Sequence, residues 1–233
     1  MATFLCIGHG HIGALRQAWH QQGGGPDAVF LLLNEPQYQP ALHERQLHPA
    51  ILEQLGKAAL HVSLLGGNDH SMVGMLNHPR RFDFVLPEAP GLPVDETAEL
   101  LPAGLLRAEL ARRIAPHLEV LAACRAAVPG RFVHIESPPP IPAAAHIEAH
   151  PGVFKDLIAE RGVSPALLRY KLWRLHAALY QESCARLGVE FLAAPPEMQD
   201  EQGMMVQLAW NPDPTHGNHI YGRHVLAQLQ ALA

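Results

Sequence analysis

The hydrophobic residues of this chain alternate between short apolar runs and longer segments with helical periodicity. The apolar runs predict strands at residues 3–7, 28–33, 61–65, 82–86, 131–135 and 189–192. The segments between and after them predict helices at residues 11–22, 49–59, 71–77, 97–127, 164–187 and 221–232. Alternation of this kind is typical of β-α-β units, so we expect a three-layer α/β/α fold around a five-stranded, mainly parallel sheet.

Glycine and proline refine these boundaries. Gly-Gly-Gly-Pro at residues 23–26 predicts a clean end to the first helix. Pro102, Gly104 and Pro116 predict that residues 97–127 form two or three helical pieces, because proline disrupts a helix interior. The sequence contains no repeat, low-complexity tail or linker, so we expect a single domain over residues 1–233.

Composition narrows the classes of partner. The 233 residues are 48% hydrophobic, enough to bury one sizeable core, and the formal net charge is -5. Without a run of lysine or arginine, nucleic acid and membrane surfaces are not expected as partners. The absence of a signal-peptide pattern and the odd, widely spaced Cys6, Cys124 and Cys184 predict a cytoplasmic chain. The sequence does not indicate an oligomeric state.

Ligands of open parallel sheets bind outside the carboxyl ends of the strands. This rule selects the predicted loops at residues 9–11, 34–38, 66–71 and 137–150. The segment at residues 211–221 joins them if it folds back over the sheet. We therefore expect the residues that bind a ligand to lie in these five segments.

The first loop contains a glycine pattern with an alternative interpretation. Gly8-x-Gly10-x-x-Gly13 lies between a strand and a helix, as in proteins that place a dinucleotide pyrophosphate on a helix N-terminus. Glu35, after the second strand, would then bind the ribose hydroxyl, and the chain would be a nicotinamide- or flavin-dinucleotide-binding protein. However, the chain is short for a cofactor domain plus a substrate domain. The glycines could also form a turn that only packs the helix on the sheet.

Two later segments favour a different interpretation. Gly66-Gly67-Asn68-Asp69 follows the third strand, and Asp213-Pro214-Thr215-His216-Gly217-Asn218 precedes the last helix. Together with the first loop, these segments resemble the SGNH (GDSL-like) hydrolase superfamily in order and position, from residue 8 to residue 222. The resemblance implies a flavodoxin-like strand order.

The resemblance also implies roles for particular residues. His216 would be the general base, and Asp213 would orient its imidazole. The Asn68 amide and the Gly10 backbone N–H would donate to a developing oxyanion. The implied activity is hydrolysis or transfer of a small or carbohydrate-linked acyl group from an ester or thioester, with no cofactor. The residues expected around the substrate are His9, His11, Gly66, Gly67, Asp69, His70 and Asn218.

The sequence departs from this superfamily at the nucleophile. Gly10 stands where the serine belongs, so a covalent acyl-enzyme through residue 10 is impossible. The glycine usual after the second strand has no clear counterpart in residues 34–38. Three alternatives follow: binding without turnover, a water activated by His216 and Asp213, or another nucleophile such as Ser71 or Ser137.

Sixteen histidines are a high number, and a histidine-tolerant surface is the simplest reason for it. A weak alternative is a metal site built from His9, His11, His70 and His216, with a carboxylate to complete the coordination shell. His-x-His is not a specific metal signature, so no metal is expected. His134 and His176 are predicted to be ordinary packing residues.

Overall fold

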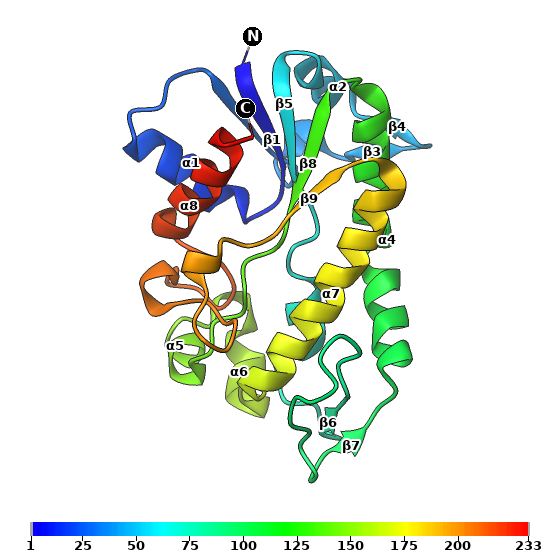
Figure 1. Ribbon diagram of the computed structural model, residues 1–233, viewed down its shortest axis with the longest axis vertical. Helices are drawn as coiled ribbons and strands as arrows, with labels where there is room; N and C mark the ends of the chain where they lie inside the picture. The colour runs from blue at the N-terminus through cyan, green and yellow to red at the C-terminus, as the bar shows by residue number, and fades with distance from the viewer. Residues whose placement is uncertain (1, 233) are drawn as a thin grey trace.

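The computed structural model describes residues 2–232, and a parallel five-stranded sheet lies at its centre (Figure 1). The strands lie side by side in the order β2 (Ala28–Leu32), β1 (Ala2–Gly8), β5 (Ala58–Leu64), β8 (Arg131–Ile135) and β9 (Glu190–Leu192). Every neighbouring pair is parallel. Counted among these five strands alone, the order is 2-1-3-4-5, which is flavodoxin-like. The predicted fold class is confirmed.

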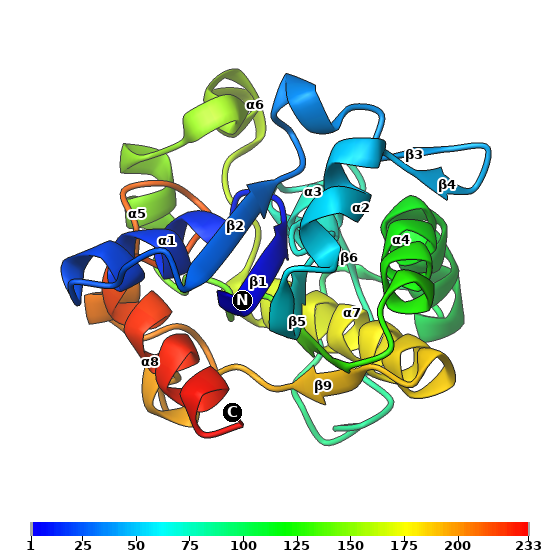
Figure 2. The same cartoon turned by 90° about the horizontal axis from the view of Figure 1, so that it is seen from above.

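Helices cover both faces of the sheet, because successive side chains of a strand point to opposite faces (Figure 2). Phe4 and Cys6 of β1 pack toward α1 (Ile12–Gln21) and α8 (His219–Gln230). Leu5 and Ile7 pack on the other face, toward α2 (Pro49–Leu55), α4 (Ala103–Ala127) and α7 (Ala166–Leu187). The alternation of β1 therefore divides the core into two layers.

Helices α1 and α8 come from opposite ends of the chain and pack in direct contact (Figure 1). Gly222 of α8 makes this approach possible, since a Cβ there would collide with the carbonyl oxygen of Ala14. Any side chain at residue 222 would push the two helices apart. The contact places the loop before α8 beside the loop before α1.

The strand predicted at residues 82–86 is shorter than expected and lies outside the main sheet. β6 (Phe82–Asp83) pairs instead with β7 (Glu99–Leu100) in a separate two-stranded sheet. A second small sheet joins β3 (Leu42–His43) to β4 (Gln46–Leu47). The short helices are α3 (Asp69–Gly74), α5 (Ala144–Ala149) and α6 (Lys155–Arg161), with 3-10 turns η1 (Pro36–Tyr38), η2 (Gly152–Phe154), η3 (Pro196–Met198) and η4 (Gln207–Ala209).

The prediction of several helical pieces in residues 97–127 is wrong, because α4 is one helix of 25 residues. Pro102 immediately precedes the helix, and Gly104 lies in its first turn, where backbone N–H groups have no intrahelical partner. Pro116 lies inside the helix but on its exposed side, where water can bind the carbonyl that loses its hydrogen bond. Packing of the apolar side of α4 on the core outweighs this disruption.

Within residues 2–232, no helix is long and apolar enough to cross a membrane. Cys6, Cys124 and Cys184 are buried and unpaired. Burial raises the pKa of Cys124 and of Cys184 to about 12, and that of Cys6 further. All three are therefore unreactive thiols that act as small core residues.

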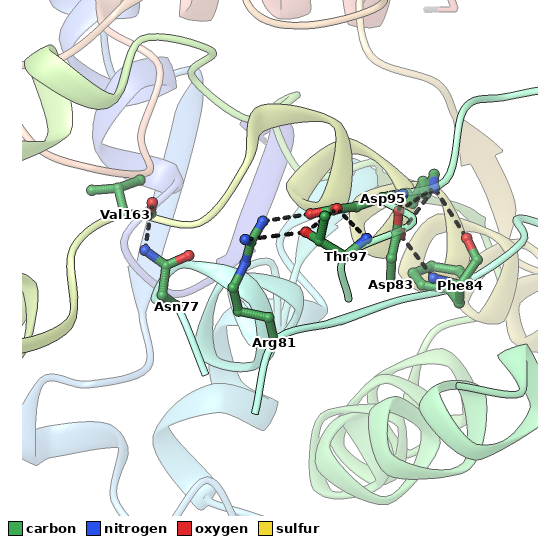
Figure 3. A network of polar contacts seen from close by, with 8 residues as sticks. Asn77, Arg81, Asp83, Phe84, Asp95, Thr97 and Val163 are labelled. Carbon is green, nitrogen blue, oxygen red and sulfur yellow. Dashed lines mark hydrogen bonds and ion pairs between the residues drawn. The ribbon is translucent and has the colours of Figure 1, made fainter. Parts of the chain in front are cut away.

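A buried ion pair holds the segment around β6 and β7 against α7. The Lys171 ammonium, with 0% of its side chain exposed, lies 2.9 Å and 3.0 Å from the two carboxylate oxygens of Asp83. It also donates to the carbonyl oxygens of Phe84 and Pro93, at 3.1 Å and 2.7 Å. Asp83 further accepts from the backbone N–H of Phe84 and of Asp95, and Figure 3 shows these bonds beside the Arg81–Asp95 ion pair.

We expect Lys171→Met to destabilise the protein by about 3–5 kcal/mol, because it leaves the Asp83 carboxylate buried without its cation. Urea unfolding followed by circular dichroism measures this loss. Lys57→Met is the matched control: it removes an exposed lysine that pairs with Glu53 one helical turn away, and should leave the unfolding midpoint unchanged. Equal midpoints for the two variants would contradict a structural role of Lys171.

Candidate active site

The loop before α8 folds back over the sheet and holds a histidine–aspartate pair. Asp213 accepts hydrogen bonds from His216 Nδ1 at 3.1 Å, from the backbone N–H of Thr215 and of His216 at 2.8 Å each, and from Asn211 Nδ2 at 2.5 Å. Burial alone would raise the pKa of Asp213, but these bonds, led by that of His216, hold it well below its ordinary value. Asp213 is therefore ionised, and Nδ1 of His216 carries the proton.

The other ring nitrogen of His216 lies against Gly10. His216 Nε2 is buried and has no hydrogen-bond partner among the described residues. A Cβ at residue 10 would lie 2.5 Å from Nε2, so the imidazole occupies the space that a side chain at residue 10 would need. Gly10 itself is exposed at the surface. The two loops from opposite ends of the chain thus meet, and only glycine at residue 10 fits this position of the ring.

His11 connects this pair to Asn68. The His11 ring, 5% exposed, lies with its centroid 4.6 Å from that of His216. Its Nε2 is 3.1 Å from Asn68 Oδ1, and because this oxygen can only accept, Nε2 carries the hydrogen. Burial, assisted by His216, lowers the pKa of His11 to about 3, so the ring is neutral. Asn68 precedes α3, its oxygen accepts from His11, and its Nδ2 donates to no described residue, so its amide hydrogens are available to a ligand.

Three further residues predicted for the pocket, Gly66, Gly67 and Asn218, have structural roles that the contacts explain. Gly66 and Gly67 pack so closely against rings that a Cβ would collide with Tyr180 Oη at the first and with His11 Cδ2 at the second. Asn218 accepts from the N–H groups of Ile220 and Tyr221 and donates to the carbonyls of Leu208 and Trp210. The Asn218 amide is thus fully used in capping α8 and has no hydrogen-bonding group free for a substrate.

His9, Asp69 and His70 lie near side chains that the sequence did not link to the site. The His9 and His117 rings are 5.1 Å apart, and burial, followed by His117, lowers the pKa of His9 to about 4. Asp69 lies 3.5 Å from His117 Nε2. The buried His70 ring lies 5.1 Å from that of His176. His117 was missed because nothing in the sequence ties a residue inside α4 to this edge.

These histidines do not assemble into a metal site. No group of three or more His, Cys, Asp or Glu side chains in residues 2–232 is arranged to hold a metal ion. His11 and His216 lie against each other, but His9 lies beside His117 and His70 beside His176, and Asp213 is already bound to His216. The weak metal alternative gains no support from this geometry.

The dinucleotide alternative is not favoured either. In that motif the third glycine allows close packing of helix on strand. A Cβ at Gly13 would meet nothing within 4 Å, so the structure has no need of glycine there. Gly10 is in contact with His216, and Glu35 accepts a hydrogen bond from Gln37 at 2.6 Å. The surroundings of all three residues are therefore accounted for without a nucleotide.

The sequence matches no protein-family model and no curated protein. Among solved structures, it is similar to the periplasmic domain of a Salmonella ser. Paratyphi A lipopolysaccharide acetyltransferase, with a TM-score of 0.52, 9% identity and coverage of 100% of this chain and 84% of that one. Phospholipase A1 from Streptomyces albidoflavus NA297 gives a TM-score of 0.50, 11% identity and coverage of 100% and 99%. A GDSL-like lipase from Bacteroides thetaiotaomicron VPI-5482 gives a TM-score of 0.43 and 12% identity, with coverage of 99% of this chain and 86% of that one. The chain therefore shares its fold with the acetyltransferase domain and the phospholipase.

Proposed function

We propose that this chain binds a small acyl ester, or an acyl group on a carbohydrate, and does not form a covalent acyl-enzyme. The contact between His216 Nε2 and Gly10 carries the proposal, because the base of the site occupies the space of the missing nucleophile. The exposed Gly10 turn and the Asn68 amide would bind the ligand carbonyl. The acetyltransferase domain and the phospholipase, which share this fold, are both named for acyl chemistry, and this supports the class of ligand.

Hydrolysis by an activated water is a second candidate. Asp213 orients His216 and leaves Nε2 as the proton acceptor, as a general base requires. Nε2 has no surface open to water in this conformation, so the ring must turn before a water can bind it. We therefore expect at most the weak activity of a triad without its nucleophile, about 10³–10⁴ over water.

Methyl 6-O-acetyl-glucoside is a suitable probe of binding. At 100 times its dissociation constant it should stabilise the protein by about 2.7 kcal/mol, measured as a shift of the thermal midpoint. Methyl glucoside without the acetyl group is the control and should give no shift, since the proposal places recognition at the carbonyl. Liquid chromatography of the same samples should find the ester intact.

Asn68→Ala should reduce the shift produced by the acetylated probe, because it removes the amide donor. Ester consumption that disappears in His216→Ala would support the activated water instead. The proposal is contradicted if the acetylated probe shifts the midpoint no more than methyl glucoside does.

A further inference from the structure

A small cavity lies behind His11, between the sheet and α8. It has a volume of about 10 Å³, room for one water molecule. Its wall is mainly apolar, with Leu15, Leu64, Ile135 and Val225 among its residues. An apolar cavity of this size would normally remain empty, so polar atoms at its wall call for a physical reason.

Three polar side chains line this cavity without a partner. His11 Nδ1, Ser137 Oγ and Tyr221 Oη each make no hydrogen bond to any described residue. Their residues are 5%, 7% and 2% exposed, so solvent does not satisfy them. Native proteins rarely leave buried polar atoms unsatisfied, and three around one cavity indicate a bound polar molecule.

The carboxylate at the cavity wall does not provide the missing bonds. Glu136 also lines the cavity, but one of its oxygens accepts from Arg174 Nη1 at 3.1 Å. The other accepts from the backbone N–H of Ala194 at 2.8 Å. Neither oxygen of Glu136 is hydrogen-bonded to His11, Ser137 or Tyr221.

The tautomer of His11 defines what the bound molecule must do. Nε2 donates to Asn68 Oδ1, so in the neutral ring Nδ1 is an acceptor. The molecule in the cavity must therefore donate a hydrogen to Nδ1. A chloride ion cannot donate, and the cavity has room for one water molecule. Water can donate to Nδ1 while bonding the two hydroxyl groups.

We propose that this cavity binds a single ordered water molecule, which links Ser137 and Tyr221 to His11 Nδ1. A water that donates to Nδ1 favours the tautomer that the bond to Asn68 Oδ1 also requires, and this tautomer holds the Asn68 amide with its oxygen toward His11 and its hydrogens free. Ser137 and Tyr221 are thereby positioning residues for Asn68. Only this last step, in which Asn68 meets a ligand, rests on the proposed function.

The test compares wild type, Tyr221→Phe and Ser137→Ala/Tyr221→Phe, with Tyr38→Phe as a control that loses a hydroxyl away from the cavity. High-resolution crystal structures should show a peak within hydrogen-bond distance of all three atoms in wild type and the control. ¹⁵N NMR of the imidazoles should show His11 protonated only at Nε2. In the double variant the peak should disappear and His11 should become a mixture of tautomers.

Binding of methyl 6-O-acetyl-glucoside provides a separate readout. Loss of one indirect hydrogen bond should weaken its affinity by about 2- to 10-fold in Tyr221→Phe and leave Tyr38→Phe unchanged. An empty cavity in wild type, a heavier ion in it, or a single unchanged tautomer in the double variant overturns the proposal. If the peak and tautomer behave as expected but no variant binds the sugar, the water site stands and the proposed function fails.

Discussion

Gly10→Ser is expected to give the protein esterase activity, raising the rate of p-nitrophenyl acetate hydrolysis about 10²–10³-fold over wild type. The serine hydroxyl would enter beside His216 Nε2, a base that Asp213 already orients. Removing the nucleophile from such a triad lowers kcat by up to about 10⁶. We expect a smaller gain because the serine Cβ would lie 2.5 Å from Nε2, so the ring must first turn away. An initial burst of p-nitrophenolate would report the acyl-enzyme.

Two variants separate this chemistry from a general effect of the substitution. Gly10→Ala adds the same Cβ and displaces His216 in the same way, but carries no hydroxyl, and should remain at the wild-type rate. Gly10→Ser/His216→Ala should lose the gained activity. A folded serine variant with no burst would remove the main support for a hydrolase-type site.

Acidification from pH 7 to pH 4.5 is expected to lower the free energy of unfolding steeply. Burial, the largest cause in each case, lowers the pKa of His11 and of His134 to about 3 and that of His176 to about 4. It also lowers the pKa of His70 well below its ordinary value. The unfolded chain takes up these protons near pH 6.5. Their contribution to stability is therefore complete above pH 6.5 and is lost progressively as the pH falls toward 3–4, by up to about 1.4 kcal/mol per pH unit for each histidine.

Urea unfolding at pH 7, 5.5 and 4.5 measures this dependence. His134→Asn removes one buried titrating ring and should flatten the slope by the share of one histidine, whatever its effect on stability at pH 7. His20→Asn removes an exposed histidine and should leave the slope as in wild type. Stability that does not change between pH 7 and pH 4.5 would show that these rings are not held neutral by burial.

Local patterns in the sequence were sufficient for the main sheet but not for the segment beside it. The strand at residues 131–135 and the segment at residues 82–86 are both short and mostly apolar, so each predicts a strand. In the structure, Asp83 of the second segment bonds to Lys171, 88 positions away in the sequence. No periodicity within a short window can contain that contact, so the separate pairing of β6 with β7 was not predictable.

The candidate site was predictable where it follows the ends of strands. The rule for parallel sheets, with the motif resemblance, selected the loops of Gly10, Asn68 and His216, and the structure brings these loops together. The contact of His216 Nε2 with Gly10 was not predicted, because it depends on the packing of α8 on α1, and the local bond from Asn211 to Asp213 was not predicted either. The roles of these residues remain proposals.

The contact between Ala14 and Gly222 has a consequence for synthesis on the ribosome. Residues 8–15 leave the ribosome early. Their packing is complete only after the residues of α8 have emerged, because α8 packs on α1. Until then, the part of the sheet that α8 covers is exposed in the nascent chain. Ligand binding should therefore begin abruptly once α8 has left the ribosome rather than increase gradually with chain length.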